Sequence, residues 1–255
     1  MSNIQIGKYA VGVDAKKAAI EAARGAKAQN DSAIMRWINP ADCPERNRIV
    51  FDDSGSMGGY IEDAKKGVVE FLKNCTPNQT AVAIHPMNSE EMKLQSDLIQ
   101  LALDVQAKRF KSGGRTPFFN TCKIALEAKP VLTRLVAFTD GSPTDRLQSE
   151  EGESAIRDYY QRDFWHDSAD IIIKIAKNTV PDKVIPIDTV FFGDVRSTNE
   201  IALLKYLSES TGGIFLHFDP AKINFKTAFK YLAPVFRAQL TDGNFRAAVE
   251  RGEKK

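Results

Sequence analysis

Cysteine is scarce in this sequence, and its three copies, Cys43, Cys75 and Cys122, lie far apart with no paired spacing. An odd and sparse set of this kind does not make a disulfide framework, so we expect reduced thiols and a cytoplasmic protein. The sequence has no Cys-x-x-Cys pair and its three histidines lack ligand spacing, which argues against a zinc site. It also has no Gly-x-x-x-x-Gly-Lys-Ser/Thr loop, which argues against an ATPase of the P-loop type.

Long apolar runs and a strong charge of one sign are also missing. No apolar stretch is long enough to span a bilayer, and the first residues contain no signal-like apolar core, so we expect neither a membrane protein nor a secreted one. The net charge of +2 points to no nucleic-acid partner, and the short basic cluster of Lys108, Arg109 and Lys111 is expected to be solvated surface. With 255 residues, of which 43% are hydrophobic, the chain has the length and composition of a globular protein.

Short apolar runs alternate with helical patterns from about residue 48 onward. The runs rich in β-branched and aromatic residues predict strands at 49–51, 80–84, 134–139, 184–192 and 214–218. Apolar residues at helical spacing predict helices at 61–72, 118–128, 168–177, 199–210 and 225–240. The segment 94–105 fits either a strand pair or a helix. Strands alternating with helices predict an α/β fold: three layers, with a doubly wound, mostly parallel, Rossmann-like sheet between helices.

We divide the chain into an N-terminal extension at 1–47, the α/β domain at 48–240 and a C-terminal tail at 241–255. The extension contains one expected helix, at 15–28, for which Asp14 is a suitable N-cap. Its apolar face is thin, so the helix either docks on the domain or serves as a partner-binding arm. An apolar group at 34–38 is expected to anchor the extension to the domain.

Oxygen-bearing side chains follow two of the expected strands. Asp52, Ser54 and Ser56 come at alternate positions directly after the first strand, and Asp140 directly follows the strand at 134–139. The carboxyl ends of parallel strands meet at one edge of a sheet, so these side chains are expected on the same rim. Carboxylate and hydroxyl oxygens are hard ligands suited to Mg²⁺. Taken singly, each segment also fits a turn or a helix N-cap.

Together with Thr116 in the segment Gly113-Gly114-Arg115-Thr116-Pro117, these residues resemble the metal-ion-dependent adhesion site (MIDAS) of von Willebrand factor type A (VWA) domains. The family's Asp-x-Ser-x-Ser motif, its threonine and its final aspartate match, in order, Asp52, Ser54, Ser56, Thr116 and Asp140. The resemblance covers about 48–236 and implies that these five side chains bind Mg²⁺ or Mn²⁺.

The same resemblance implies a function. It indicates a protein-interaction module of the intracellular, bacterial type and not an enzyme. An acidic residue of another protein would fill the open position on the metal. Cytosolic relatives work inside larger complexes, so the partner is expected to be an AAA-type ATPase or a stress-response complex, and neither nucleic acid nor a membrane.

Two residues depart from the family pattern. Asp53 lies where the family often has a hydrophobic residue, and we expect it to face away from Asp52 and to serve a structural role. Arg115 separates the glycine pair from Thr116, and it could hold an acidic partner through a bidentate pair.

A serine hydrolase is the alternative reading. The segment Ser54-Gly55-Ser56-Met57-Gly58 fits a loosened nucleophile elbow with Ser56 as the nucleophile. Asp140 or Asp188, followed by His217, would complete the order of a catalytic triad. This reading leaves two of the candidate metal ligands without a role, and too little chain precedes the elbow to build the usual sheet. The sequence therefore favours the interaction module.

Overall fold

The computed structural model describes residues 39–76, 79–110, 113–147, 163–194 and 196–218. These residues belong to the unit Ile38–Lys255. The helices predicted at 15–28 and 225–240, the apolar group at 34–38 and the tail at 241–255 lie outside the described residues, so the predicted division of the chain remains a prediction.

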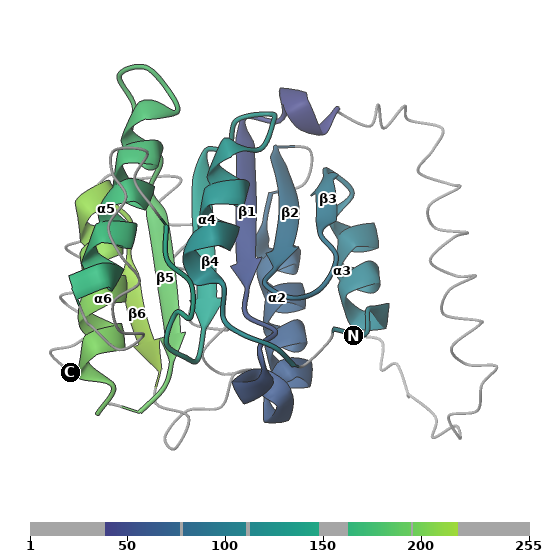
Figure 1. Cartoon of the computed structure of the whole chain (residues 1–255). Helices are drawn as coiled ribbons and strands as arrows, with labels where there is room; N and C mark the ends of the chain where they lie inside the picture. Colours follow the sequence, from purple (N-terminus) through teal and green to yellow (C-terminus); the bar gives the residue numbers. More distant parts are fainter. Residues whose placement is uncertain (1–38, 77–78, 111–112, 148–162, 195, 219–255) are drawn as a thin grey trace, which may run out of the picture. The chain divides into compact units, whose positions relative to one another are not determined.

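A six-stranded sheet lies at the centre of the described domain (Figure 1). Its strands are β1 (Glu45–Phe51), β2 (Thr80–Pro86), β3 (Met92–Gln95), β4 (Arg134–Thr139), β5 (Ile187–Phe192) and β6 (Phe215–Phe218). Their order across the sheet is β3-β2-β1-β4-β5-β6. All neighbouring pairs are parallel except β2 and β3, which are antiparallel. The predicted mostly parallel sheet is confirmed.

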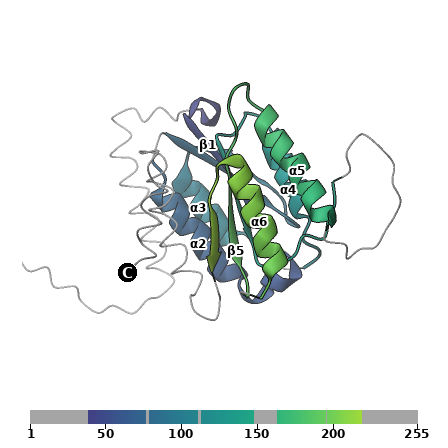
Figure 2. The same cartoon turned by 90° about the vertical axis from the view of Figure 1, so that its left-hand side faces the viewer.

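Helices cover both faces of this sheet (Figures 1 and 2). One face carries α2 (Ile61–Asn74) and α3 (Leu98–Ala107), and the other carries α4 (Phe118–Glu127), α5 (Asp163–Asn178) and α6 (Thr198–Thr211). Alternate residues of β1 enter opposite cores: Ile49 and Phe51 pack with α2 and α3, and Val50 packs with α4 and α5. A strand buried on both faces has no polar face, which is why such strands read as continuous apolar runs.

The structure resolves one ambiguous segment and moves the start of the first strand. The ambiguous segment 94–105 contains the end of β3 and most of α3, which begins after an N-cap in which Asp97 accepts a hydrogen bond from the Gln100 N–H at 3.0 Å. β1 begins at Glu45, before the expected domain start at residue 48. Its early part was missed because it contains arginines. Arg48 is nonetheless buried, and its guanidinium donates to the carbonyls of Ala125 and Pro130, both at 2.7 Å.

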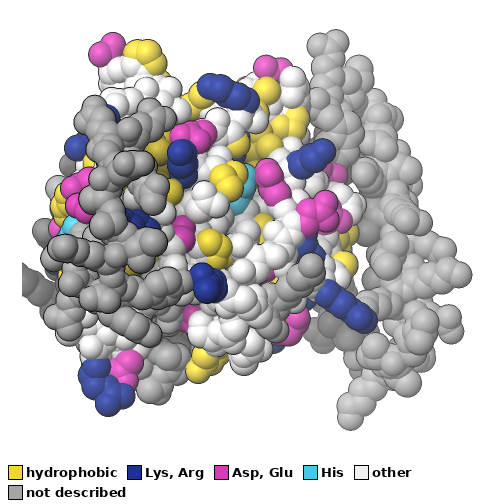
Figure 3. Space-filling view, in the orientation of Figure 1, with side chains coloured by type: hydrophobic (Ala, Val, Ile, Leu, Met, Phe, Trp, Pro, Cys, Tyr) yellow, Lys and Arg dark blue, Asp and Glu magenta, His cyan; other side chains and the backbone are white. Residues whose placement is uncertain are grey.

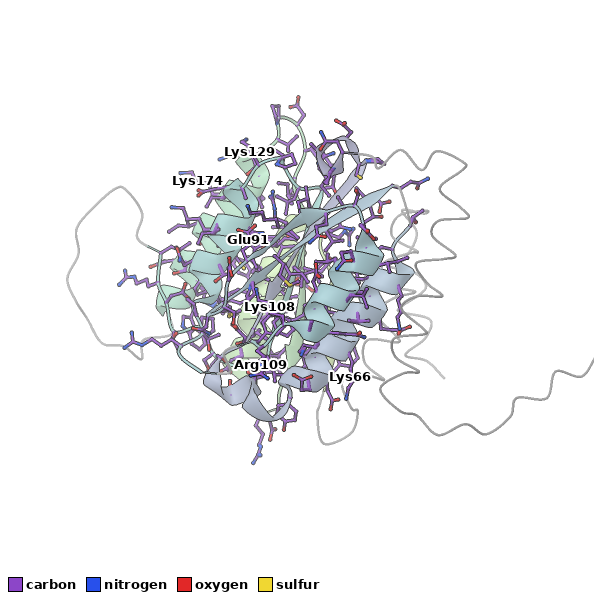
Figure 4. All side chains as sticks on the ribbon, turned by 90° about the vertical axis from the view of Figure 1, so that its right-hand side faces the viewer. Lys66, Glu91, Lys108, Arg109, Lys129 and Lys174 are labelled. Atoms are coloured by element: carbon purple, nitrogen blue, oxygen red, sulfur yellow. The ribbon has the colours of Figure 1, made fainter. Side chains whose placement is uncertain are left out.

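On the face shown in Figure 3, charge of one sign does not gather in one place. Acidic, basic and apolar side chains are interspersed on the face seen in Figure 3. The basic residues labelled in Figure 4 lie spread over the ribbon: Lys66, Lys108, Arg109, Lys129 and Lys174. Lys111 lies outside the described residues. No helix in the described part of the chain is both long and apolar enough to cross a bilayer.

Candidate functional site

The ends of β1 and β4 bring the first and last segments of the predicted site together. These strands are neighbours, with Phe51 paired to Phe138. One residue further on, the Asp52 N–H donates to the Phe138 carbonyl at 3.0 Å. Because neighbouring strands lie only about 5 Å apart, Asp52 and Asp140 follow adjacent strand ends on the same edge of the sheet. This edge faces downward in Figure 1.

Asp52 is held in a fixed orientation by both loops. Its side chain has no solvent exposure. Oδ1 accepts a hydrogen bond from the Ser54 N–H at 2.9 Å, and Oδ2 accepts one from the Thr139 hydroxyl at 2.6 Å. Thr139 was not among the side chains that the sequence predicted for this site. The available signal was a hydroxyl residue in an apolar strand directly before the candidate ligand Asp140.

The two serines continue this group of oxygen atoms. Ser54 Oγ and Ser56 Oγ are 3.0 Å apart, and the Ser56 hydroxyl donates to Asp140 Oδ1 at 2.7 Å. The 3-10 helix η2 (Gly55–Gly59) contains Ser56 and turns the chain here. Ser54 is buried whereas Ser56 is exposed, so the group is open to solvent on one side. The structure therefore brings four of the five predicted ligands into one hydrogen-bonded group.

The carboxyl group of Asp140 is shifted toward its neutral form. Burial raises its pKa to about 6, the Ser56 hydrogen bond opposes that shift, and the charge of Asp52 adds to it. Each cause is a property of the site without a cation. A divalent ion among these oxygens would stabilise the ionised carboxylate and thereby lower the pKa of Asp140.

Thr116, the fifth predicted ligand, lies on a loop tied to the segment that follows Asp140. Its N–H donates to the Thr144 hydroxyl at 2.8 Å, and its carbonyl accepts from the Thr144 N–H at 2.9 Å. Thr116 is nearly buried, and its hydroxyl has no hydrogen-bond partner among the described residues. The structure therefore places Thr116 on a loop joined to the Asp140 segment but does not link its hydroxyl to the other four residues.

The helix that follows Thr116 already has its first amides occupied. Asp145 accepts hydrogen bonds from the N–H groups of Phe119 and Asn120, at 3.2 and 2.6 Å. This carboxylate caps α4 from another segment of the chain, and Pro117 at the N-cap position makes no side-chain cap of its own. These two amides of the α4 N-terminus are therefore not free to bind an anion.

The residues of the hydrolase alternative are not assembled. His217 lies on β6, where its Nε2 is 2.8 Å from the Gly193 carbonyl oxygen. Asp188 forms an ion pair with Arg134 at 2.7 Å. Ser56 hydrogen-bonds to two other members of the oxygen group, and no histidine contacts its hydroxyl among the described residues.

The donor set has the chemistry of a hard cation site. It consists of two carboxylates and three hydroxyls, which suit Mg²⁺ or Mn²⁺ better than Zn²⁺. Within the described ranges, no three His, Cys, Asp or Glu side chains cluster in a way that could hold a metal ion. A cation in this domain would thus depend on hydroxyl oxygens as well as on carboxylates.

No protein-family model and no curated protein matches this sequence. Solved structures do match. A conserved hypothetical protein, BatB from Bacteroides thetaiotaomicron, is similar with a TM-score of 0.50 and 15% identity, over 78% of this chain and 100% of that one. The pilus adhesin SpaC from Lactobacillus rhamnosus GG, in an open conformation, gives a TM-score of 0.55 and 17% identity, over 75% of this chain and 30% of the adhesin.

A third solved structure carries the family name. The VWA domain of SpRpn10 gives a TM-score of 0.51 and 16% identity, over 71% of this chain and 92% of that domain. Identities this low show a common fold and nothing finer. With its strand order, its helices on both faces and this structural likeness, the chain has the fold of a von Willebrand factor type A domain.

Proposed function

We propose that this domain is a metal-dependent protein-interaction module. In this proposal Asp52, Ser54, Ser56, Thr116 and Asp140 hold a Mg²⁺ or Mn²⁺ ion, and an acidic side chain of another protein completes its coordination. The bound ion supplies a strongly electrophilic position that attracts a carboxylate.

One observation carries the proposal: oxygen atoms from two separate loops form a continuous group at adjacent strand ends. Ser54 Oγ lies 3.0 Å from Ser56 Oγ, which lies 2.7 Å from Asp140 Oδ1. A serine hydroxyl that donates one hydrogen bond still has two lone pairs, so it is able to face a cation. The same oxygens that satisfy one another in the free protein are therefore able to satisfy a small divalent ion.

The surrounding contacts supply the orientation that such a site needs. Asp52 is held by the Ser54 N–H and the Thr139 hydroxyl, so its position does not depend on a bound ion. Asp140 contributes negative charge from the opposite loop. Ser56 is exposed, which leaves the approach to a partner open. Orientation of ligands by surrounding hydrogen bonds is typical of metal sites in proteins.

The proposal includes a setting and a non-catalytic role. The resemblance of the site motifs to those of cytosolic VWA proteins supports a cytoplasmic protein that works with an AAA-type ATPase or a stress-response complex. The separation of His217 from Ser56 supports an interaction module without hydrolase activity.

Calorimetric titration with Mn²⁺ and Mg²⁺ tests metal binding. We expect the wild-type protein to bind either ion and Asp140→Ala to lose most of that affinity while remaining folded, because the site lies on the rim and outside the core. Asp167→Ala is a matched control, since it removes an exposed carboxylate from α5. Unchanged affinity in Asp140→Ala would remove Asp140 from the site.

A pull-down tests the partner. We expect protein partners to be retained in Mg²⁺, released in EDTA and lost with Asp140→Ala. Partners that remain bound in EDTA and to the variant would show that recognition does not pass through the metal.

A further inference from the structure

Asp53 lies next to the first proposed ligand but faces a different loop. Its side chain has no solvent exposure. Oδ1 accepts a hydrogen bond from the Asn88 backbone N–H at 2.7 Å, and Oδ2 accepts one from the Ser89 hydroxyl. Both donors follow the end of β2, so this carboxylate ties the loop after β1 to the loop after β2.

The side chain of Asn88 carries the connection on to the loop before Thr116. Its Nδ2 donates to the Arg115 carbonyl at 2.9 Å. The Asp53 carbonyl in turn accepts a hydrogen bond from the Gly113 N–H at 3.3 Å. The backbone before Thr116 is therefore attached at two points to Asp53 and its partner Asn88.

The close approach of these loops explains why glycine occupies position 114. Gly114 has φ of +96°, a conformation that L residues with a side chain rarely adopt. A Cβ atom built there would lie 2.7 Å from Asn88 Oδ1. The Asn88 side chain thus packs directly against the turn that delivers Thr116.

Thr116 is consequently held from two directions. Thr144 binds its N–H and its carbonyl, whereas Asn88 binds the carbonyl of the preceding residue, Arg115. Thr144 belongs to the segment that follows β4, and Asn88 follows β2. The loop therefore takes its position from two different strand ends, one on each side of β1.

We propose that Asp53 and Asn88 are positioning residues that hold the Thr116 loop in place for cation binding. We call this pair the Asp53–Asn88 bridge. The inference rests on the proposed function in that it takes Thr116 as a metal ligand. It assigns a role to the residue that departs from the usual motif: Asp53 acts through hydrogen bonds to neighbouring loops, and it does not touch the ion.

Asn88→Ala tests the bridge, because it removes the two Nδ2 bonds, to the Arg115 carbonyl at 2.9 Å and to Asp53 Oδ1 at 3.4 Å, and keeps the backbone bond to Asp53. In the metal-free protein we expect hydrogen exchange at 113–118 to become roughly ten times faster, since the loop loses a tie to a neighbouring strand end. We expect Mn²⁺ affinity, measured by calorimetry, to fall roughly 10-fold to 100-fold, as for other outer partners of metal ligands. Asn120→Ala, which truncates an exposed asparagine at the start of α4, is the matched control and should change neither quantity.

A double-mutant cycle separates positioning from general loosening. If Asn88 acts through Thr116, then Asn88→Ala combined with Thr116→Val should bind Mn²⁺ within about threefold of the weaker single variant. If the double variant instead lost Mn²⁺ affinity by the product of the two single-variant losses, Asn88 would act independently of Thr116. That result would overturn the proposal.

Substitutions at Asp53 add a second line of evidence. Asp53→Asn should keep near-wild-type exchange at 113–118, because an amide oxygen still accepts from the Asn88 N–H and the amide group is able to donate to Ser89 Oγ. Asp53→Ala should increase exchange as Asn88→Ala does. If exchange at 113–118 stayed unchanged in Asn88→Ala and Asp53→Ala, the bridge would hold nothing in place. Failure of the wild-type protein to bind Mn²⁺ would instead refute the proposed function, and the exchange data would still decide on the bridge.

Discussion

Replacing Asp140 with asparagine should stabilise the metal-free domain while weakening its affinity for a cation. The substitution keeps the side-chain shape, and the Ser56 hydroxyl is still able to donate to the amide oxygen. What it removes is a carboxyl group whose pKa is raised to about 6, chiefly by burial. At neutral pH the folded wild-type protein therefore carries an unfavourable ionised group.

The size and sign of the effect follow from that pKa. Raising the pKa from 3.8 to about 6 corresponds to at most roughly 3 kcal/mol against the folded state. Because Asp140 is only half-buried and solvent screens its charge, we expect about 1–2 kcal/mol. The folded state holds this proton more tightly than the unfolded state, so the penalty is absent below about pH 4, grows as the pH rises, and is complete above about pH 6.

Denaturation in EDTA measures this effect directly. At about pH 8, Asp140→Asn should raise the melting temperature by several degrees, since 1 kcal/mol corresponds to about 2–4 °C in a chain of this size. At about pH 4 the wild type and the variant should melt together. Added Mn²⁺ should raise the melting temperature of the wild type much more than that of the variant, because a ligand stabilises only the state that binds it.

Two results would refute this reasoning. A lower stability of Asp140→Asn at about pH 8 would show that the carboxylate is not penalised in the free site. An equal gain at both pH values would show that the gain does not come from removing an ionised group. Asp167→Asn, at an exposed position on α5, controls for the general effect of removing a negative charge.

The remaining predictions concern the two hydroxyls that contact the candidate carboxylates. Thr139→Val should lower the free energy of unfolding by about 1–3 kcal/mol in urea titrations, because it leaves the buried Asp52 Oδ2 without its donor; no loss would mean that water replaces this contact. Ser56→Ala should reduce Mn²⁺ affinity with little change in stability, since Ser56 is exposed. Wild-type Ser56 should not react with a fluorophosphonate, as no histidine contacts its hydroxyl among the described residues; covalent labelling at Ser56 would support the hydrolase instead.

The fold class was predictable because its signal is local. The strand predicted at 134–139 matches β4 (Arg134–Thr139), since the continuous apolar run from Leu135 to Phe138 is typical of a strand buried on both faces. The first strand was predicted too short because Arg46 and Arg48 interrupt that signal. Arg48 is buried only because the carbonyls of Ala125 and Pro130, 77 and 82 residues away, accept its hydrogen bonds. No local pattern contains that information.

Part of the candidate site could likewise be predicted from the sequence, and part could not. The sequence by itself determined which side chains follow the ends of β1 and β4, because motif order and strand pattern are properties of neighbouring residues. Only the tertiary structure decided which of them meet: Thr139 reaches Asp52 across 87 residues, and Asn88 reaches Asp53 across 35. Those contacts exist because β1 lies between β2 and β4, and the order of strands in a sheet is set by how the whole chain packs its apolar faces.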